Sequence, residues 1–196
     1  MADTLSFLDS ATWLNPPPKW SLDADGLSVT TGKDTDFWQD TFYGFRRDNG
    51  HCLAAPIAGD FSAVATFSGA YETLYDQAGL MLRIDPDNWV KAGIELEAGA
   101  AHFSTVVTRA GRSDWSMLPV AAIGTSQSIR LTRVGGAIAV HYPDTEGGWR
   151  LMRLADFPGT DDATVGPMAC SPQRAGFTVR FSAFTVGAPA PVLAEA

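Results

Sequence analysis

The chain has 196 residues, of which 45% are hydrophobic and 18% charged, a composition typical of a folded globular protein rather than a disordered one. Its formal net charge of -8 at pH 7 repels phosphate backbones, so we expect no nucleic-acid partner. No apolar run approaches the roughly 20 residues that a membrane helix needs, so we expect no membrane partner.

The first residues, MADTLSFLDSATWLNPPP, lack the basic region and the long apolar run of a secretory signal. We therefore expect a cytoplasmic protein. In that compartment Cys52 and Cys170 are expected to be buried free thiols, with a disulfide or a metal site as the less favoured alternatives.

Short runs of alternating apolar residues recur along the chain, separated by Gly, Pro, Asn and Asp, while helical periodicity is almost absent. This pattern predicts an all-β fold. We find no interior linker or repeat, so we predict one domain over 1–196, with a core at about 12–187 and a loose tail at 188–196. The expected strands are, in chain order, 60–69, 78–84, 89–96, 102–109, 128–134, 137–142 and 176–186.

Residues 75–96, YDQAGLMLRIDPDNWVKAGIEL, predict a β-hairpin that turns at DPDN. Side chains alternate between the faces of a strand, and opposite residues of a hairpin share a face. One register makes one face apolar and the other polar, because a shift by one residue would bury Lys91 and Glu95 among aliphatic side chains. The predicted pairs are Arg83 with Trp89, Met81 with Lys91, Gly79 with Gly93, and Gln77 with Glu95.

The polar face of this hairpin is the candidate site. It combines the amide of Gln77, the ammonium of Lys91, the carboxylate of Glu95 and the indole of Trp89, with a trough expected at the facing glycines. Fixed polar groups bond sugar hydroxyls, and a flat ring stacks on the C–H face of a pyranose. The alternative is a solvated sheet face that carries a Lys91–Glu95 ion pair.

Four segments carry a resemblance: FWQDTFYGFRRDNGH, YETLYDQAGLMLRIDPDNWVKAGIELEAG, VVTRAGRSDWS and MACSPQRAGFTVRFSAF. Together they resemble the DUF1349 family over roughly residues 12 to 187. The resemblance implies a concanavalin A-like jelly-roll sandwich of two antiparallel sheets. In such sandwiches the concave sheet holds the sugar or catalytic groups, which implies that the polar face is concave. Some members are labelled by similarity to a yeast regulator of enolase.

The leading functional hypothesis is a cleft on the concave sheet that binds a carbohydrate or glycoside. Its centre is expected at Gln77, Lys91 and Glu95. Its rim is expected to include Asp76, Tyr75, Trp38 and Trp115.

Two other functions stay open, and the sequence does not decide whether the protein is an enzyme. In the first, a glycoside hydrolase-like enzyme uses Glu95 as acid or base, with Lys91 tuning it. Related jelly-roll glucanases carry E-x-D-x-x-E, whereas Glu95 and Glu97 give only E-x-E. In the second, the chain is a protein-interaction or regulatory module of carbohydrate metabolism, which a broad flat apolar patch would favour.

We expect no cofactor and no metal. His51 and His102 have no partner at the spacing of a zinc site. The aspartates Asp34, Asp36 and Asp40 do not form a known calcium loop and are expected in a solvated loop. The chain also has no Gly-rich phosphate loop before a helix.

Overall fold

The computed structural model describes residues 6–120, 126–159 and 162–193. Within these ranges the chain is a sandwich of two large antiparallel sheets, as predicted, with one 3-10 turn, η1 (Ser6–Ser10), and a small third sheet of β4 (Phe37–Gln39) and β5 (Arg46–Asp48). The first sheet has the order β1 (Thr12–Leu14), β6 (His51–Ile57), β15 (Ala163–Cys170), β8 (Gln77–Asp85), β9 (Asn88–Glu97), β10 (Ala100–Arg109) and β11 (Arg112–Pro119). The second has the order β14 (Trp149–Asp156), β13 (Ala137–Pro143), β12 (Gln127–Val134), β7 (Phe61–Gly69), β16 (Thr178–Gly187), β3 (Gly26–Thr30) and β2 (Lys19–Asp23).

The main hydrophobic core fills the space between the two large sheets. Leu80 of β8 and Ile94 of β9 enter it from the first sheet, and Phe67 of β7 and Phe181 of β16 enter it from the second. These are the apolar sides of strands that alternate with period two, so burying them against each other removes both from water. The sandwich thus follows from the alternation that the sequence displays.

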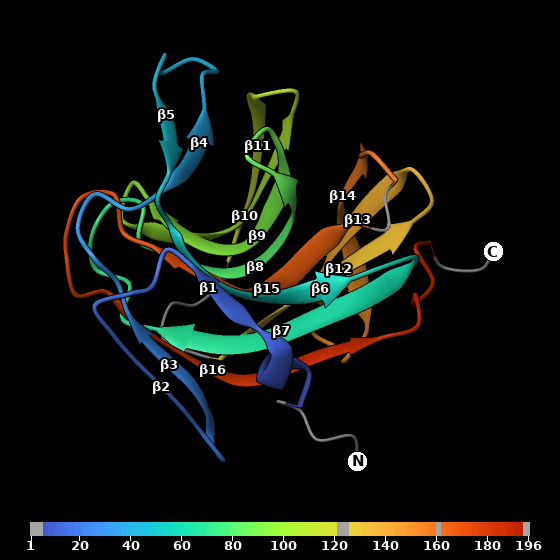
Figure 1. The fold of residues 1–196 in the computed structure, drawn as a ribbon, viewed down its shortest axis with the longest axis horizontal. Coiled ribbons are helices and arrows are strands. Elements are labelled where there is room, and N and C mark those ends of the chain that lie inside the picture. The colour runs from blue at the N-terminus through green and yellow to red at the C-terminus, as the bar shows by residue number, and fades with distance from the viewer. Residues whose placement is uncertain (1–5, 121–125, 160–161, 194–196) are drawn as a thin grey trace.

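A second hydrophobic cluster lies on the opposite face of the first sheet. It joins Phe37 and Trp38 of β4 to Met81, Trp89 and neighbouring side chains of the first sheet. Figure 1 shows the first sheet curving, with the β4–β5 hairpin standing over its hollow side. The middle of this sheet is therefore covered on both faces.

Trp89 was expected on the open polar face, and that expectation is wrong. Its side chain is fully buried, and its ring lies 6.0 Å from the ring of Phe37. The indole N–H donates to the carbonyl oxygen of Pro86 at 3.1 Å. The hairpin register put Trp89 on the correct face, but β4 covers that face, so this ring anchors the β4–β5 hairpin instead of meeting a ligand.

The described part of the predicted loose tail is bonded to the second sheet. The amide of Ala190 donates to Ser62 Oγ at 2.8 Å, and the carbonyl of Val192 lies 3.0 Å from Nε2 of His141. Residues 194–196 lie outside the described residues.

No helix in the described ranges is both long and apolar enough to span a bilayer.

The facing glycines Gly79 and Gly93 serve the packing of the strands themselves. A Cβ at Gly79 would lie 2.1 Å from the carbonyl oxygen of Ala92, and one at Gly93 would lie 2.0 Å from that of Ala78. The close approach predicted at this trough is thus made by the neighbouring strand. Glycine at both positions leaves room for the backbone of the partner strand.

We therefore predict that Gly79→Ala destabilises the fold by about 1–3 kcal/mol, because the added methyl forces β8 and β9 apart. Urea denaturation gives the free energy of unfolding. Gly187→Ala is the matched control, since a Cβ at Gly187 meets nothing within 4 Å. Equal stability of the two variants would contradict the crowding between these strands.

Candidate functional site

The β8–β9 hairpin has the predicted register. The partners are Arg83 with Trp89, Met81 with Lys91, Gly79 with Gly93, and Gln77 with Glu95. Side chains of the other parity, such as Leu80 and Ile94, lie in the main core. Gln77, Lys91 and Glu95 therefore share the face that points away from the second sheet.

This polar face is not the solvated surface that the alternative interpretation described. Gln77 and Lys91 are each 4% exposed, and Glu95 is 6% exposed. Alternation indicates which side chains share a face, but it does not indicate what covers that face. Here the β4–β5 hairpin and Asp36, the residue before β4, close over the three side chains, which face a hollow beneath the hairpin.

Lys91 pairs with Asp36, not with Glu95 as the solvated alternative supposed. Its Nζ lies 2.9 Å from Asp36 Oδ1 and donates to Gln77 Oε1 at 2.6 Å. Burial by itself would lower the pKa of Lys91, but Asp36 and the other nearby acids outweigh burial, and the pKa is raised. Lys91 is thus held as a buried cation.

Glu95 lies at the end of a hydrogen-bonded chain. Trp115 Nε1 donates to Ser104 Oγ at 2.9 Å, and Ser104 Oγ donates to Glu95 Oε2 at 2.6 Å. The Gln77 amide approaches the other carboxylate oxygen at 3.5 Å. Burial raises the pKa of Glu95 above its ordinary value, and Lys91 and Ser104 oppose that rise.

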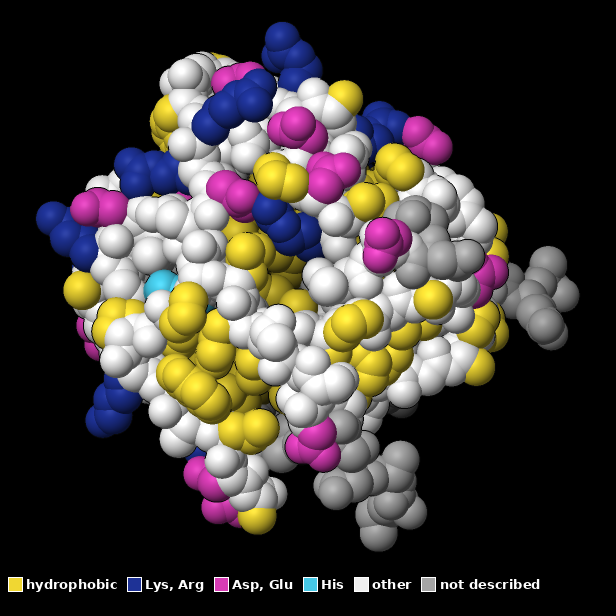
Figure 2. All heavy atoms as spheres, viewed as in Figure 1, with side chains coloured by type: hydrophobic (Ala, Val, Ile, Leu, Met, Phe, Trp, Pro, Cys, Tyr) yellow, Lys and Arg dark blue, Asp and Glu magenta, His cyan; other side chains and the backbone are white. Residues whose placement is uncertain are grey.

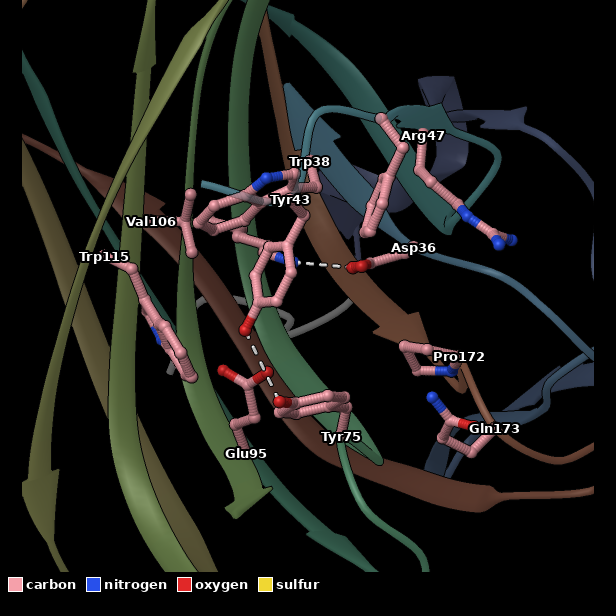
Figure 3. A pocket seen from close by; sticks show the side chains of 12 residues that line it. Asp36, Trp38, Tyr43, Arg47, Tyr75, Glu95, Val106, Trp115, Pro172 and Gln173 are labelled. Carbon is pink, nitrogen blue, oxygen red and sulfur yellow. Dashed lines mark hydrogen bonds and ion pairs between the residues drawn. The ribbon is translucent and has the colours of Figure 1, made fainter. Parts of the chain in front are cut away.

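A pocket with a volume of about 260 Å³ opens over Lys91 and Glu95. Figure 3 shows Tyr43, Tyr75 and Trp115 around the Glu95 carboxylate, with Trp38 farther off beside Tyr43, while Asp36, Arg47 and Gln173 lie toward the other end. The lining residues are Asp36, Trp38, Tyr43, Phe45, Arg47, Tyr75, Lys91, Glu95, Val106, Trp115, Pro172 and Gln173.

The pocket brings together most of the residues that the sequence nominated. Trp38, Tyr75 and Trp115 line its walls, and Lys91 and Glu95 form its floor. Gln77 lies deeper, in a narrow hollow of about 10 Å³, where it supports Lys91 from below. The predicted site centre is therefore one connected network.

Asp76 does not lie at the rim as expected. Its fully buried carboxylate accepts hydrogen bonds from Ser171 Oγ at 2.7 Å and from Arg174 Nη2 at 2.6 Å. Its Oδ2 also accepts the backbone N–H groups of Glu72 and Thr73. Asp76 thus fixes the loop that leads into β8.

That loop holds Tyr75 in an unusual backbone conformation, with φ at 66°. A residue with a large side chain adopts this region only where its surroundings enforce it. The enforcing contacts are the Asp76 bonds and the Tyr75 N–H, which donates to the carbonyl of Leu96 at 2.7 Å. This backbone conformation directs the Tyr75 ring over the pocket. Asp76 therefore acts on the pocket by positioning Tyr75.

Sequence reasoning missed one side of the pocket. Asp36 was expected in a solvated loop, and Tyr43, Phe45, Arg47 and Gln173 were not considered. The available signal was the density of aromatic residues in TFYGF at 41–45, where three rings surround one glycine. This segment forms the tip of the β4–β5 hairpin. The hairpin has no alternation of apolar and polar residues that would predict its strands.

The described residues contain no group of three His, Cys, Asp or Glu side chains arranged to hold a metal ion. His51 has a structural role: its Nε2 accepts the Gly32 N–H at 3.0 Å, and its Nδ1 lies 2.7 Å from the carbonyl oxygen of Asn15. Cys52 and Cys170 are buried free thiols, as predicted, and burial raises the pKa of Cys52 to about 12.

The fold and the site define a concanavalin A-like β-sandwich with an aromatic-walled pocket on its concave sheet. The chain belongs to the family described as Protein of unknown function (DUF1349), whose model matches residues 13–189. It is 43% identical over 182 residues to Regulation of enolase protein 1 of Saccharomyces cerevisiae, covering 93% of this chain and 91% of the yeast protein.

Solved structures support the same fold. The crystal structure of a functionally unknown protein from Saccharomyces cerevisiae superposes with a TM-score of 0.89 at 42% identity, over 95% of this chain and 100% of that one. The GH43 protein BlXynB of Bacillus licheniformis superposes with a TM-score of 0.70 at 16% identity, over 90% of this chain and 36% of that one. The second likeness establishes the fold alone.

The raised pKa of Glu95 predicts a pH-dependent contribution to stability. In the unfolded chain Glu95 has an ordinary pKa of 4.5. The folded protein therefore keeps the Glu95 proton at a pH where the unfolded chain has lost it. This contribution is present below that value and is lost as the pH rises through the folded pKa. We expect Glu95→Gln to gain stability relative to wild type as the pH rises above about 4.5.

Urea denaturation of both proteins between about pH 4 and pH 8 measures this difference. Ser104→Ala removes a hydrogen bond that favours the ionised carboxylate, so its stability should fall more steeply with pH than that of wild type. Parallel profiles for wild type and Glu95→Gln would contradict the raised pKa.

Proposed function

We propose that the pocket binds a small carbohydrate or glycoside. The observation that carries the proposal is the arrangement of Trp38, Tyr43, Tyr75 and Trp115 around a floor of hydrogen-bonding groups. Aromatic faces pack against the C–H faces of a sugar ring, while a carboxylate and an ammonium bond its hydroxyls. The walls and the floor together offer both kinds of contact.

The floor keeps hydrogen-bonding capacity for a ligand. The Lys91 ammonium has three donors, and Asp36 and Gln77 take two of them. The Glu95 carboxylate has several acceptor positions, of which Ser104 and Gln77 use part. A sugar hydroxyl both donates and accepts, so one hydroxyl can bridge these two groups.

The volume of about 260 Å³ is near the lower end of ligand pockets in proteins, which suits a ligand of monosaccharide size. The fold supports the same class by analogy, because BlXynB carries a GH43 name. That analogy concerns the fold, and the proposal depends on the pocket.

The protein-interaction hypothesis rests on the yeast relative, whose name refers to regulation of enolase. A broad flat apolar patch would favour such a role. At the centre of the concave face the described residues form a walled pocket with a charged floor instead. We therefore rank a small ligand above a protein partner.

The saccharide proposal predicts that Trp115→Ala weakens binding about tenfold, because it removes one ring wall and the donor to Ser104. A glycan array would select the ligand, and isothermal titration calorimetry would give the affinity. Trp20→Ala removes a tryptophan of β2 that lies outside the pocket and should bind as wild type does. Failure of wild type to bind any glycan would overturn the proposal and favour a protein partner.

A second candidate function is glycoside hydrolysis with Glu95 as the general acid. Burial raises the pKa of Glu95, as in carboxylic acids that donate a proton to a leaving group. A second carboxylate is close by, because the Gln77 amide nitrogen lies 3.4 Å from Asp36 Oδ1 and 3.5 Å from Glu95 Oε1. Glycosidases use two carboxyl groups, about 5–5.5 Å apart in retaining enzymes and about 6.5–9.5 Å apart in inverting ones.

If this function holds, release of nitrophenol from nitrophenyl glycosides should fall about 100-fold or more in Glu95→Gln and in Asp36→Asn. Glu97→Gln removes a carboxylate outside the network and should keep the wild-type rate. Circular dichroism checks that each variant is folded. No turnover by wild type on glycosides that it binds would reject hydrolysis and retain binding.

A further inference from the structure

Four aromatic side chains that line the pocket with Glu95 form a box: Trp38, Tyr43, Tyr75 and Trp115. The rings of Trp38 and Trp115 lie 6.3 Å apart at 82°, and those of Trp115 and Tyr75 lie 6.3 Å apart at 74°. Tyr43 meets Trp38 at 5.4 Å and 72°, and its hydroxyl lies 3.5 Å from that of Tyr75. Each ring thus stands nearly perpendicular to its neighbour, and the hydroxyl contact closes the circuit.

The charges beneath the box place two acids, Asp36 and Glu95, beside one cation, Lys91. Lys91 forms its ion pair with Asp36. In the part of the chain that the structure describes, the hydrogen bonds of Glu95 come from the neutral groups Ser104 and Gln77. With Glu95 ionised, the floor of Asp36, Lys91 and Glu95 therefore holds one more negative charge than positive.

The other cation of the lining is directed elsewhere. Arg47 donates to the carbonyl oxygen of Asp34 at 2.7 Å, and its guanidinium lies 5.6 Å from the centre of the Phe45 ring. Figure 3 shows this guanidinium pointing away from Glu95. It does not compensate the carboxylate inside the box.

A cation inside the aromatic box would be attracted both by the ring faces and by the Glu95 carboxylate. The faces of aromatic rings carry partial negative charge and attract a cation that lies within about 6 Å of a ring centre. Ionising a buried carboxylate costs free energy, and a positive group that lies beside the carboxylate offsets this cost. A neutral ligand does not offset it. An anionic ligand would meet both the ring faces and Glu95 unfavourably.

We propose that this aromatic box receives the ammonium group of an amino-bearing glycoside, which pairs with Glu95. The inference rests on the proposed carbohydrate function and names the class of sugar. The sugar ring extends from the box toward Asp36 and Gln173, where the pocket continues. The ammonium donates to the carboxylate oxygens that Ser104 and Gln77 leave accessible.

Three matched ligands test the charge. Methyl glucosaminide carries an ammonium at a pH where its amine is protonated, methyl glucoside carries a hydroxyl at the same carbon, and methyl N-acetylglucosaminide carries a neutral amide. Tetramethylammonium chloride supplies a cation without a sugar. Calorimetry gives the affinities, and the indole N–H resonances of Trp38 and Trp115 report occupation of the box.

We expect methyl glucosaminide to bind about tenfold or more tightly than either neutral glycoside. Glu95→Gln removes the charge, conserves the shape and should abolish this preference without abolishing binding of the neutral glycosides. Glu146→Gln makes the same change of charge on the exposed β13–β14 turn and should keep the preference. A thermal melt checks the fold of both variants.

The other outcomes separate the two proposals. Equal affinity for all three glycosides, unchanged in Glu95→Gln, would overturn the ammonium site and leave the carbohydrate function standing. Binding of tetramethylammonium with no binding of any glycoside would overturn the carbohydrate function and support the box as a cation site. Binding of none of these ligands, while other glycans bind, overturns the ammonium site alone.

Discussion

The ion pair between Lys91 and Asp36 is the contact on which the site depends. A buried ammonium without a partner costs several kcal/mol, so Lys91 requires an acid wherever it is covered. Its side chain is 5% exposed and that of Asp36 is 14% exposed, with 2.9 Å between the charged atoms. Because Asp36 immediately precedes β4, this requirement fixes the start of the β4–β5 hairpin over the concave sheet.

Apolar packing and a partly buried, bidentate ion pair complete the attachment of the hairpin. Phe37 contacts Trp89 from above, and Arg83 of β8 holds Asp48 of β5 at 2.7 Å. Figure 2 shows acidic and basic side chains interspersed at the end of the molecule where β4, β5 and β11 lie. The exposed pairs there contribute little energy each. The hairpin is therefore placed mainly by the Lys91–Asp36 and Arg83–Asp48 pairs and by the buried rings. It brings Trp38, Tyr43 and Phe45 to the pocket.

The sequence predicts the parts of this arrangement that follow from local periodicity. The register of β8 and β9, the apolar face and the joint location of Gln77, Lys91 and Glu95 all follow from a period of two and the cost of burying charge. Burial of the polar face does not follow, because its cover comes from a separate segment whose strands have three residues each. Asp36 illustrates the limit: only its contact with Lys91 distinguishes it from the neighbouring aspartates.

The position of Tyr75 escapes prediction for a related reason. Its left-handed backbone depends on Asp76, and Asp76 in turn depends on Arg174, which is 98 residues away in the chain. A polar residue next to a strand was reasonably assigned to the rim, since exposed acids outnumber buried ones. The structure uses it as the buried support of a pocket wall, where Arg174, Ser171 and two backbone N–H groups pair with its carboxylate.

The surroundings of Glu95 favour binding over hydrolysis. A general acid must hold its proton until it gives it to the substrate, so its pKa must lie near the operating pH. Ser104 donates to Glu95, and Trp115 donates to Ser104, so this chain of donors supports the carboxylate. Asp36, the other carboxylate, is already paired with Lys91 and is poorly suited to act as nucleophile or base. The network therefore holds Glu95 in a fixed position among aromatic rings, an arrangement suited to recognising a ligand before catalysing a reaction.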